Sequence, residues 1–240
     1  MKQQIDILAF GAHPDDVELS AAGILLAHKA KGYSIGIIDL TEGELGTRGT
    51  VETRYAEAKK SAEILGLSAR VNLNLGDGRF QNTPEEQAKI IEQIRRFRPK
   101  IVLCNAPSDR HPDHGRGSKL VADACFFSGL RKIETEWEGE KQEAYRPEFV
   151  YHYIQDYFIE PDLVIDVTEF VDTKIECIKA FNTQFYSPDS KEPVTPISGE
   201  HFFEFIRSRM SGLGRFIGAQ YAEGLICART PGVKDLFDLK

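Results

Sequence analysis

The sequence predicts an α/β protein with a Rossmann-like parallel sheet, helices on both faces, and an irregular C-terminal extension to the same single domain. Apolar runs that end in turn residues alternate with helical segments through the first half, and a length of 240 residues suits one α/β domain. We expect residues 1–240 to form this domain, with a core at 1–130 and further strands, a lid loop (186–200) and helices within 131–240.

Four strands are predicted in the first half of the chain. IDILAFGA is a continuous apolar run, which is typical of a strand buried on both faces. SIGIIDLT and KIVLCNA are also apolar, whereas RVNLNL alternates apolar and polar residues and predicts a weaker strand. The predicted bounds are 5–12, 34–41, 70–75 and 100–106.

A helix is predicted after each of these strands. The first stops at Gly32 and the second at Gly66, and Pro84 opens the third, where the missing amide hydrogen has no cost. The predicted bounds are 17–31, 52–65, 84–98 and 115–129. This alternation implies a parallel sheet with right-handed crossovers, in which ligands bind at the carboxyl ends of the strands.

The second half is less regular. Strands are predicted at 148–154 and 163–168, with a helix over 169–182. The segment 186–200 is polar and rich in Pro and Ser, which predicts a long loop that could act as a lid. A helix is expected after it, with a break near Gly212.

The composition limits the classes of binding partner and the cell compartment that we expect for this protein. The net charge of −7 and a pI near 5.5 argue against nucleic-acid or anionic-membrane binding. No apolar run is long enough for a membrane span. The 4 cysteines are far apart, which favours buried reduced thiols and a cytoplasmic protein.

Two histidine-carboxylate clusters follow the first and fourth predicted strands. They read HPDD at 13–16 and HPDH at 111–114. One His-Pro tetrapeptide is more often only a turn, but two at strand ends of one parallel sheet indicate a site. Strands one and four could be neighbours at the topological switch point, which would bring the clusters together.

The residue types in these clusters suit a catalytic zinc. Such a metal takes three His, Asp or Glu ligands and leaves a position for water. His13 and Asp16 lie on one turn, and His114 supplies a third ligand from the other loop. Asp15 is then free to act as a general base on the water, whose pKa zinc lowers.

His111 is left without a ligand role in this scheme. Protonated, it could polarise the amide oxygen or protonate the leaving amine, and Asp113 is close enough in sequence to orient it or to stabilise its charge. A tyrosine could instead stabilise the oxyanion. The candidates are Tyr151, Tyr153, Tyr157 and Tyr186.

The sequence resembles the LmbE-like (PIG-L) zinc deacetylases, which act on N-acetylglucosamine conjugates. The resemblance rests on A-H-P-D-D at 12–16 and H-P-D-H at 111–114, and it is clear to about residue 130. It implies a homo-oligomer, with a hexamer among the options, and one Zn²⁺ per chain. It implies these roles: zinc ligands His13, Asp16 and His114, general base Asp15, and His111 assisting with Asp113 behind it.

Finer features resemble the branch that acts in bacillithiol biosynthesis. They are the segment 41–49, Arg54, and YAEG at 221–224. That branch hydrolyses N-acetylglucosaminyl-malate to glucosaminyl-malate. Arg54 or Arg48 could bind a malate carboxylate, or each could instead be solvated or paired with Glu52 or Glu57.

Two other function classes remain to be weighed. A phosphoesterase with two metals could use both clusters, but it would need bridging carboxylates and more ligands. A nucleotide-binding module would require a glycine-rich loop after the first strand, where the chain has GAHP instead.

Overall fold

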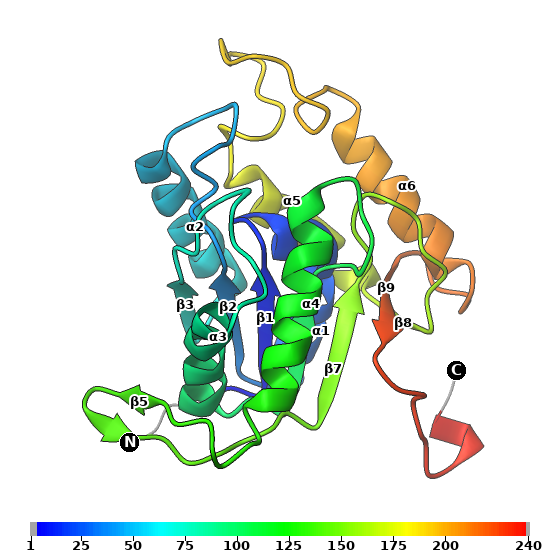
Figure 1. The fold of residues 1–240 in the computed structure, drawn as a ribbon. Coiled ribbons are helices and arrows are strands. Elements are labelled where there is room, and N and C mark those ends of the chain that lie inside the picture. The colour runs from blue at the N-terminus through cyan, green and yellow to red at the C-terminus, as the bar shows by residue number, and fades with distance from the viewer. Residues whose placement is uncertain (1–3, 239–240) are drawn as a thin grey trace.

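The computed structural model describes residues 4–238 and confirms the α/β class (Figure 1). Its large sheet has the strand order β3-β2-β1-β4-β7-β9-β8. The strands of this sheet are β1 (Ile7–Gly11), β2 (Ile35–Asp39), β3 (Ala69–Asn72), β4 (Ile101–Cys104), β7 (Phe149–Tyr153), β8 (Leu163–Asp166) and β9 (Ala222–Cys227). The helices are α1 (Asp16–Ala30), α2 (Val51–Leu65), α3 (Pro84–Phe97), α4 (Pro112–Phe127), α5 (Val171–Lys179) and α6 (Phe202–Gly214). A small hairpin, β5 (Glu136–Trp137) and β6 (Glu140–Lys141), lies outside the sheet.

The strands at the centre of the sheet are arranged as the sequence predicted, with the first and fourth strands as neighbours. β1 pairs in parallel with β2 on one side and with β4 on the other. The chain runs outward from β1 through β2 to β3, then returns to place β4 on the opposite side of β1. This reversal is the topological switch point of a doubly wound sheet, so the loops that follow β1 and β4 open side by side.

Helices cover both faces of the sheet. On β1, Ile7 and Ala9 pack into the layer with α1, α2 and α5, whereas Leu8 and Phe10 pack into the layer with α3 and α4. Figure 1 shows α3 and α4 in front of the sheet and α1 behind it. Because the strand is buried on both faces, its sequence is a continuous apolar run rather than an alternating one.

The C-terminal half adds strands to the sheet instead of forming a separate layer. β7 continues the parallel part, and β9 pairs antiparallel with both β7 and β8. The sequence analysis predicted no strand at β9. Glu223 interrupts the apolar run there, and its carboxylate is buried against the amides of Gly23 and Ile24 and the ammonium of Lys174.

The segment 186–200 contains turns and bends, as expected of a loop. All 4 cysteines are free, and Cys227 is less buried than the other three. Among residues 4–238, no helix combines the length and apolar character needed to cross a bilayer.

Candidate metal centre and active site

The two histidine clusters meet above the carboxyl ends of β1 and β4. The ring centroids of His13 and His111 are 4.6 Å apart, and those of His111 and His114 are 5.2 Å apart. Each cluster lies where a loop leads from a strand into the next helix, from β1 into α1 and from β4 into α4, so the pairing of these two strands brings the clusters together. The site is therefore built at the switch point.

The HPDD turn is held in an unusual backbone conformation. Asp15 has φ 131°, a region that side chains other than glycine rarely adopt and that costs of order 1–3 kcal/mol. Hydrogen bonds to Asp16 fix the turn, from the backbone of His13 (3.0 Å) and the side chains of Asn105 (3.0 Å) and Gln155 (3.2 Å). Asn105 follows β4 and Gln155 follows β7, so neighbouring strands hold the carboxylate of Asp16.

Asp16 lies between two histidine rings. Its Oδ1 is 3.1 Å from Nε2 of His114, and its Oδ2 is 3.6 Å from Nδ1 of His13. The other ring nitrogen of His114 hydrogen-bonds to the buried carboxylate of Asp109 at 2.5 Å. This carboxylate–histidine arrangement is typical of metal sites, where it fixes the tautomer and leaves the second nitrogen for the ion.

The donor atoms fit a divalent metal. Ligand atoms of His13, His111 and His114 all lie within 4.8 Å of one another, and Asp16 contacts two of these histidines. His111, to which the sequence analysis gave no ligand role, lies in the same group. Imidazole and carboxylate donors at such separations suit Zn²⁺ and other first-row metals.

A second group of ligand atoms shares His13. Nε2 of this ring is 3.0 Å from Asp77 and 3.5 Å from Asp113, and these three residues also lie within 4.8 Å of one another. The sequence analysis missed Asp77 and Asp109. Asp77 is in a loop beyond the carboxyl end of β3, and ligands bind at this edge of such sheets. Its place after a predicted strand could therefore have indicated a site residue.

The carboxylate of Asp113 contacts groups other than the ring of His111. It accepts a hydrogen bond from the backbone of Gly78 at 2.7 Å and pairs with Arg116 at 2.5 Å. The backbone N–H of Asp113, in contrast, donates to Nδ1 of His111 at 3.2 Å. The contact between these two residues therefore runs through the main chain.

His111 is poised to be neutral. Burial lowers the pKa of its imidazole, and the charges of His13 and His114 lower it further. Because Nδ1 accepts the N–H of Asp113, a neutral ring carries its proton on Nε2. This differs from the protonated His111 considered in the sequence analysis, because burial and the neighbouring imidazoles both disfavour a positive charge on this ring.

Asp15 is buried beside the cluster. Burial raises the pKa of its carboxyl to about 7, although Arg54 acts in the opposite direction. Arg54 donates to the backbone oxygen of Pro14 at 2.7 Å and to Gln184 at 2.6 Å, and it lies 3.3 Å from Asp15. Of the pairings considered from sequence, neither glutamate is its partner: Glu57 accepts hydrogen bonds from Thr183 instead.

Arg48 is also buried, next to the segment 186–200. Its Nη2 donates to Ser190 at 2.6 Å, and its backbone oxygen accepts a hydrogen bond from Gln184. Its Nε is buried without a hydrogen-bond partner. Arg48 therefore connects the loop after β2 to the predicted lid.

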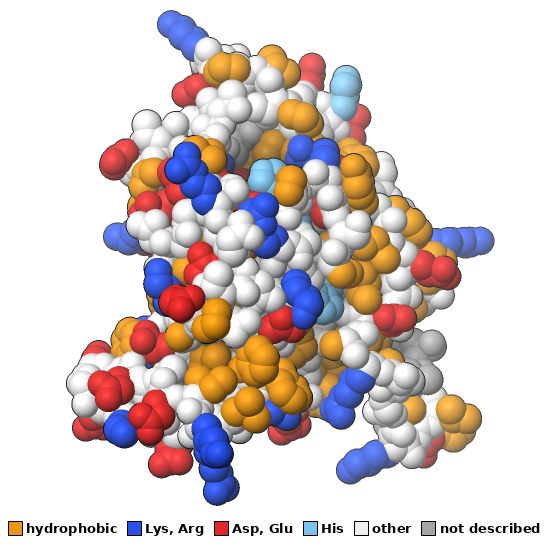
Figure 2. Space-filling view, viewed as in Figure 1, with side chains coloured by type: hydrophobic (Ala, Val, Ile, Leu, Met, Phe, Trp, Pro, Cys, Tyr) orange, Lys and Arg blue, Asp and Glu red, His pale blue; other side chains and the backbone are white. Residues whose placement is uncertain are grey.

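A cavity of about 350 Å³ lies at this site, and its lining includes His13, Asp15, Asp16, His111 and His114. One side comes from the clusters and from Arg48 and Arg54, and the other from Thr195, Ile197 and Arg209 in the 186–200 segment and α6. Figure 2 shows histidine atoms between basic side chains in the upper part of the visible face. Among the described residues, no tyrosine lines this cavity, and Tyr153 instead donates to the backbone of Phe10.

Comparison with known proteins identifies the family. Residues 8–125 match the family described as PIG-L, GlcNAc-PI de-N-acetylase. The fold also matches a conserved protein from Thermus thermophilus, with a TM-score of 0.86, 32% identity, and coverage of 97% of this chain and 99% of that one. The chain belongs to the PIG-L (LmbE-like) family. This confirms the resemblance found in the HPDD and HPDH motifs.

Two curated PIG-L relatives differ in the sugar conjugate that they act on. Diacetylchitobiose deacetylase from Thermococcus kodakarensis is 28% identical over 91% of this chain and 81% of its own length. A probable N-acetyl-alpha-D-glucosaminyl L-malate deacetylase 2 from Bacillus anthracis is 27% identical over 77% of this chain and 84% of its own length. The PIG-L chain described here is therefore an N-deacetylase, a hydrolase of amide bonds.

Proposed function

We propose that the chain hydrolyses the acetamide of N-acetylglucosaminyl-malate, releasing acetate and glucosaminyl-malate for bacillithiol biosynthesis. The observation that carries the hydrolytic part is the buried Asp15 beside the cluster of His13, Asp16 and His114 in an open cavity. The malate part is supported by the Bacillus anthracis relative and by the motif at 41–49.

We propose that one Zn²⁺ per chain is held by His13, Asp16 and His114. The contacts of Asp16 with both rings, and of Asp109 with the far side of His114, support this ligand set. A bound metal supplies a Lewis acid that polarises the acetyl carbonyl and makes water a stronger acid.

Asp15 is the proposed general base. Its carboxylate takes a proton from the attacking water, and a pKa near neutrality lets the same group hold the proton and release it to the leaving amine. The buried position raises the pKa, whereas Arg54 keeps enough of the carboxylate form available.

His111 is the proposed donor to the acetyl oxygen. A neutral imidazole with its proton on Nε2 can donate a hydrogen bond to the charge that develops there. The absence of tyrosine from the described cavity lining supports this assignment over a tyrosine. Asp113 positions His111 through its backbone N–H, while its carboxylate faces His13.

Arg48 and Arg54 were the candidate ligands for the malate carboxylates. In this structure their guanidinium groups already bind Ser190 and the Asp15 region, respectively. A substrate role for either would require a carboxylate to reach donors that are now buried. We therefore propose that Arg48 and Arg54 form walls of the cavity.

Amine release from three N-acetylated substrates tests the proposal. They are N-acetylglucosaminyl-malate, its inositol analogue and N,N′-diacetylchitobiose. We expect the highest kcat/KM with the malate conjugate. Faster turnover of diacetylchitobiose would contradict the malate assignment but retain deacetylation, whereas no amine release from any of them would overturn the function.

Metal stoichiometry separates this function from a phosphoesterase with two metals. That alternative has no support from the family or from the curated relatives. One zinc per chain in fully active protein supports deacetylation as proposed. Two metals per chain, together with release of phosphate from a phosphoester, would favour the alternative.

We also propose that the protein is a cytoplasmic homo-oligomer, with a hexamer as the size to test. The free cysteines support a reducing compartment. Light scattering of the purified protein measures the assembly, and a monomeric mass at micromolar concentration would rule out a stable oligomer.

A further inference from the structure

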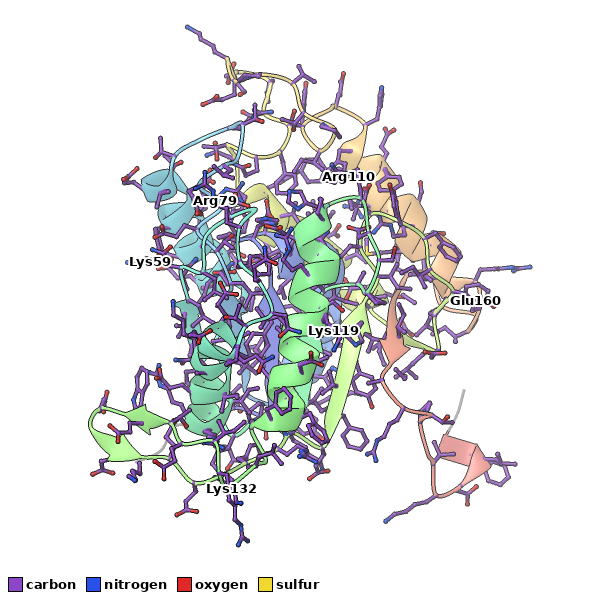
Figure 3. All side chains as sticks on the ribbon, in the orientation of Figure 1. Lys59, Arg79, Arg110, Lys119, Lys132 and Glu160 are labelled. Carbon is purple, nitrogen blue, oxygen red and sulfur yellow. The ribbon has the colours of Figure 1, made fainter. Side chains whose placement is uncertain are left out.

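Two arginines that the sequence analysis did not single out line the same cavity. Arg110 precedes the HPDH cluster and Arg209 lies on α6. Arg110 Nε is 3.0 Å from the carboxylate of Asp156, and Arg209 Nη2 is 3.3 Å from the backbone oxygen of the same residue. Figure 3 shows Arg110 in the upper part of the molecule, between α4 and α6.

Asp156, the partner of both arginines, is next in sequence to a residue that contacts a candidate metal ligand. Asp156 follows Gln155, whose side chain donates to Asp16. The guanidinium groups therefore meet a segment that is anchored to the candidate metal ligands. A group attached to a sugar whose acetamide reaches Asp15 would extend along this cavity wall.

The guanidinium groups of the two arginines differ in whether they already form an ion pair with a carboxylate. Arg110 forms an ion pair with Asp156 and is exposed. Arg209 is half-buried, and in the described part of the chain no carboxylate forms an ion pair with it. Burial lowers the pKa of its guanidinium, and the carboxylates of Asp156 and Asp109 act in the opposite direction from beyond ion-pair distance.

The guanidinium of Arg209 is also held in place. It lies over the ring of Phe205, one turn earlier on α6, at 4.7 Å from the ring centroid. Cation–π stacking restrains the plane of an arginine while leaving its N–H groups free at the edge. A carboxylate is the ligand that matches such a planar set of donors.

We propose that Arg209, assisted by Arg110, binds a carboxylate on the aglycone and selects anionic over neutral glucosaminides. This inference rests on the proposed function, because it names the residues that bind the part of the substrate distant from the acetamide. Arg209 is a specificity-determining residue in this scheme, and Arg54 and Arg48 hold the cavity walls.

The test compares Arg209→Gln with Arg207→Gln on an anionic and a neutral substrate. Arg207 is on the same helix, and it pairs at 2.9 Å with the exposed Asp172 outside the cavity. Losing a charged hydrogen bond should lower kcat/KM for N-acetylglucosaminyl-malate by about ten- to a hundredfold in Arg209→Gln. Turnover of N,N′-diacetylchitobiose should change by less than about twofold, and Arg207→Gln should resemble wild type on both substrates.

A binding arm separates failure of this inference from failure of the function. Calorimetry with L-malate alone should detect binding to the wild-type protein and to Arg207→Gln, and at least tenfold weaker binding to Arg209→Gln. Arg209→Lys, which keeps the charge and loses the planar fork, should fall between them. Equal losses on both substrates, or unchanged malate binding, would overturn the role of Arg209 while deacetylation stands. A wild-type enzyme that deacetylates neither substrate would overturn the function, and the malate titration would still decide whether Arg209 binds a carboxylate.

Discussion

Arg54 Nη1 lies 3.3 Å from Oδ2 of Asp15, with both side chains buried in the wall of the cavity. The positive charge favours the carboxylate form of Asp15, while burial favours the protonated form and raises the pKa to about 7. The pair therefore sets how much of the general base is available near neutral pH. An arginine that the sequence suggested for substrate binding is positioned to act on the base instead.

Arg54→Gln should reduce activity most at low pH. Removing the positive charge raises the pKa of Asp15 further, so less carboxylate is present at neutral pH and more is recovered as the pH rises. The measurement is a pH–rate profile of kcat, whose acid limb should move to higher pH. We expect similar losses with malate and chitobiose conjugates, and a loss confined to the malate conjugate would restore the substrate role of Arg54.

Asp15→Asn should keep its metal and lose turnover. Asparagine tolerates positive φ better than most residues, so it suits the backbone at φ 131° better than alanine does. Loss of a general base should lower kcat by about 10²- to 10⁴-fold. Metal content and kcat are measured on the same sample, with Asp172→Asn as the exposed control, and substantial activity in Asp15→Asn would remove this residue from the base role.

Asp109→Asn should weaken metal binding without removing a ligand. The carboxylate bound to Nδ1 of His114 orients the ring, and the loss of such a partner typically costs about 10- to 100-fold in metal affinity. Competition with a chelator measures the dissociation constant. His13→Ala and His114→Ala mark complete ligand loss and should retain no stoichiometric metal. Wild-type affinity in Asp109→Asn would mean that other contacts orient His114.

Lys174→Met should destabilise the fold by about 3–5 kcal/mol, because it leaves the carboxylate of Glu223 buried without its partner. Urea denaturation measures the free energy of unfolding. Lys179→Met, at an exposed position on the same helix, should change it by no more than about 0.5 kcal/mol. Adding Glu223→Gln to Lys174→Met should recover part of the loss, and purely additive effects would show that the two charges are not coupled.

The central sheet and the location of the site could be predicted from the pattern of residues along the chain. Strands buried on both faces read as continuous apolar runs, and the HPDD and HPDH clusters follow two of them. Once β1 and β4 were expected to be neighbours at the switch point, the convergence of the clusters followed from the general geometry of parallel sheets. These features are encoded locally, within a few residues of each motif.

The side chains that contact the motif residues could be identified only after the chain was seen folded. Asp77, Asp109 and Gln155 come from separate loops, and no periodicity links them to His13, His114 or Asp16. The strand β9 was not predicted for the same reason. Its buried Glu223 is stabilised by Lys174, which is far away in the sequence. From the sequence alone, a charged residue is expected to be exposed to solvent. Only the packing of the folded chain shows whether an opposite charge compensates for the hydration that a buried charge loses.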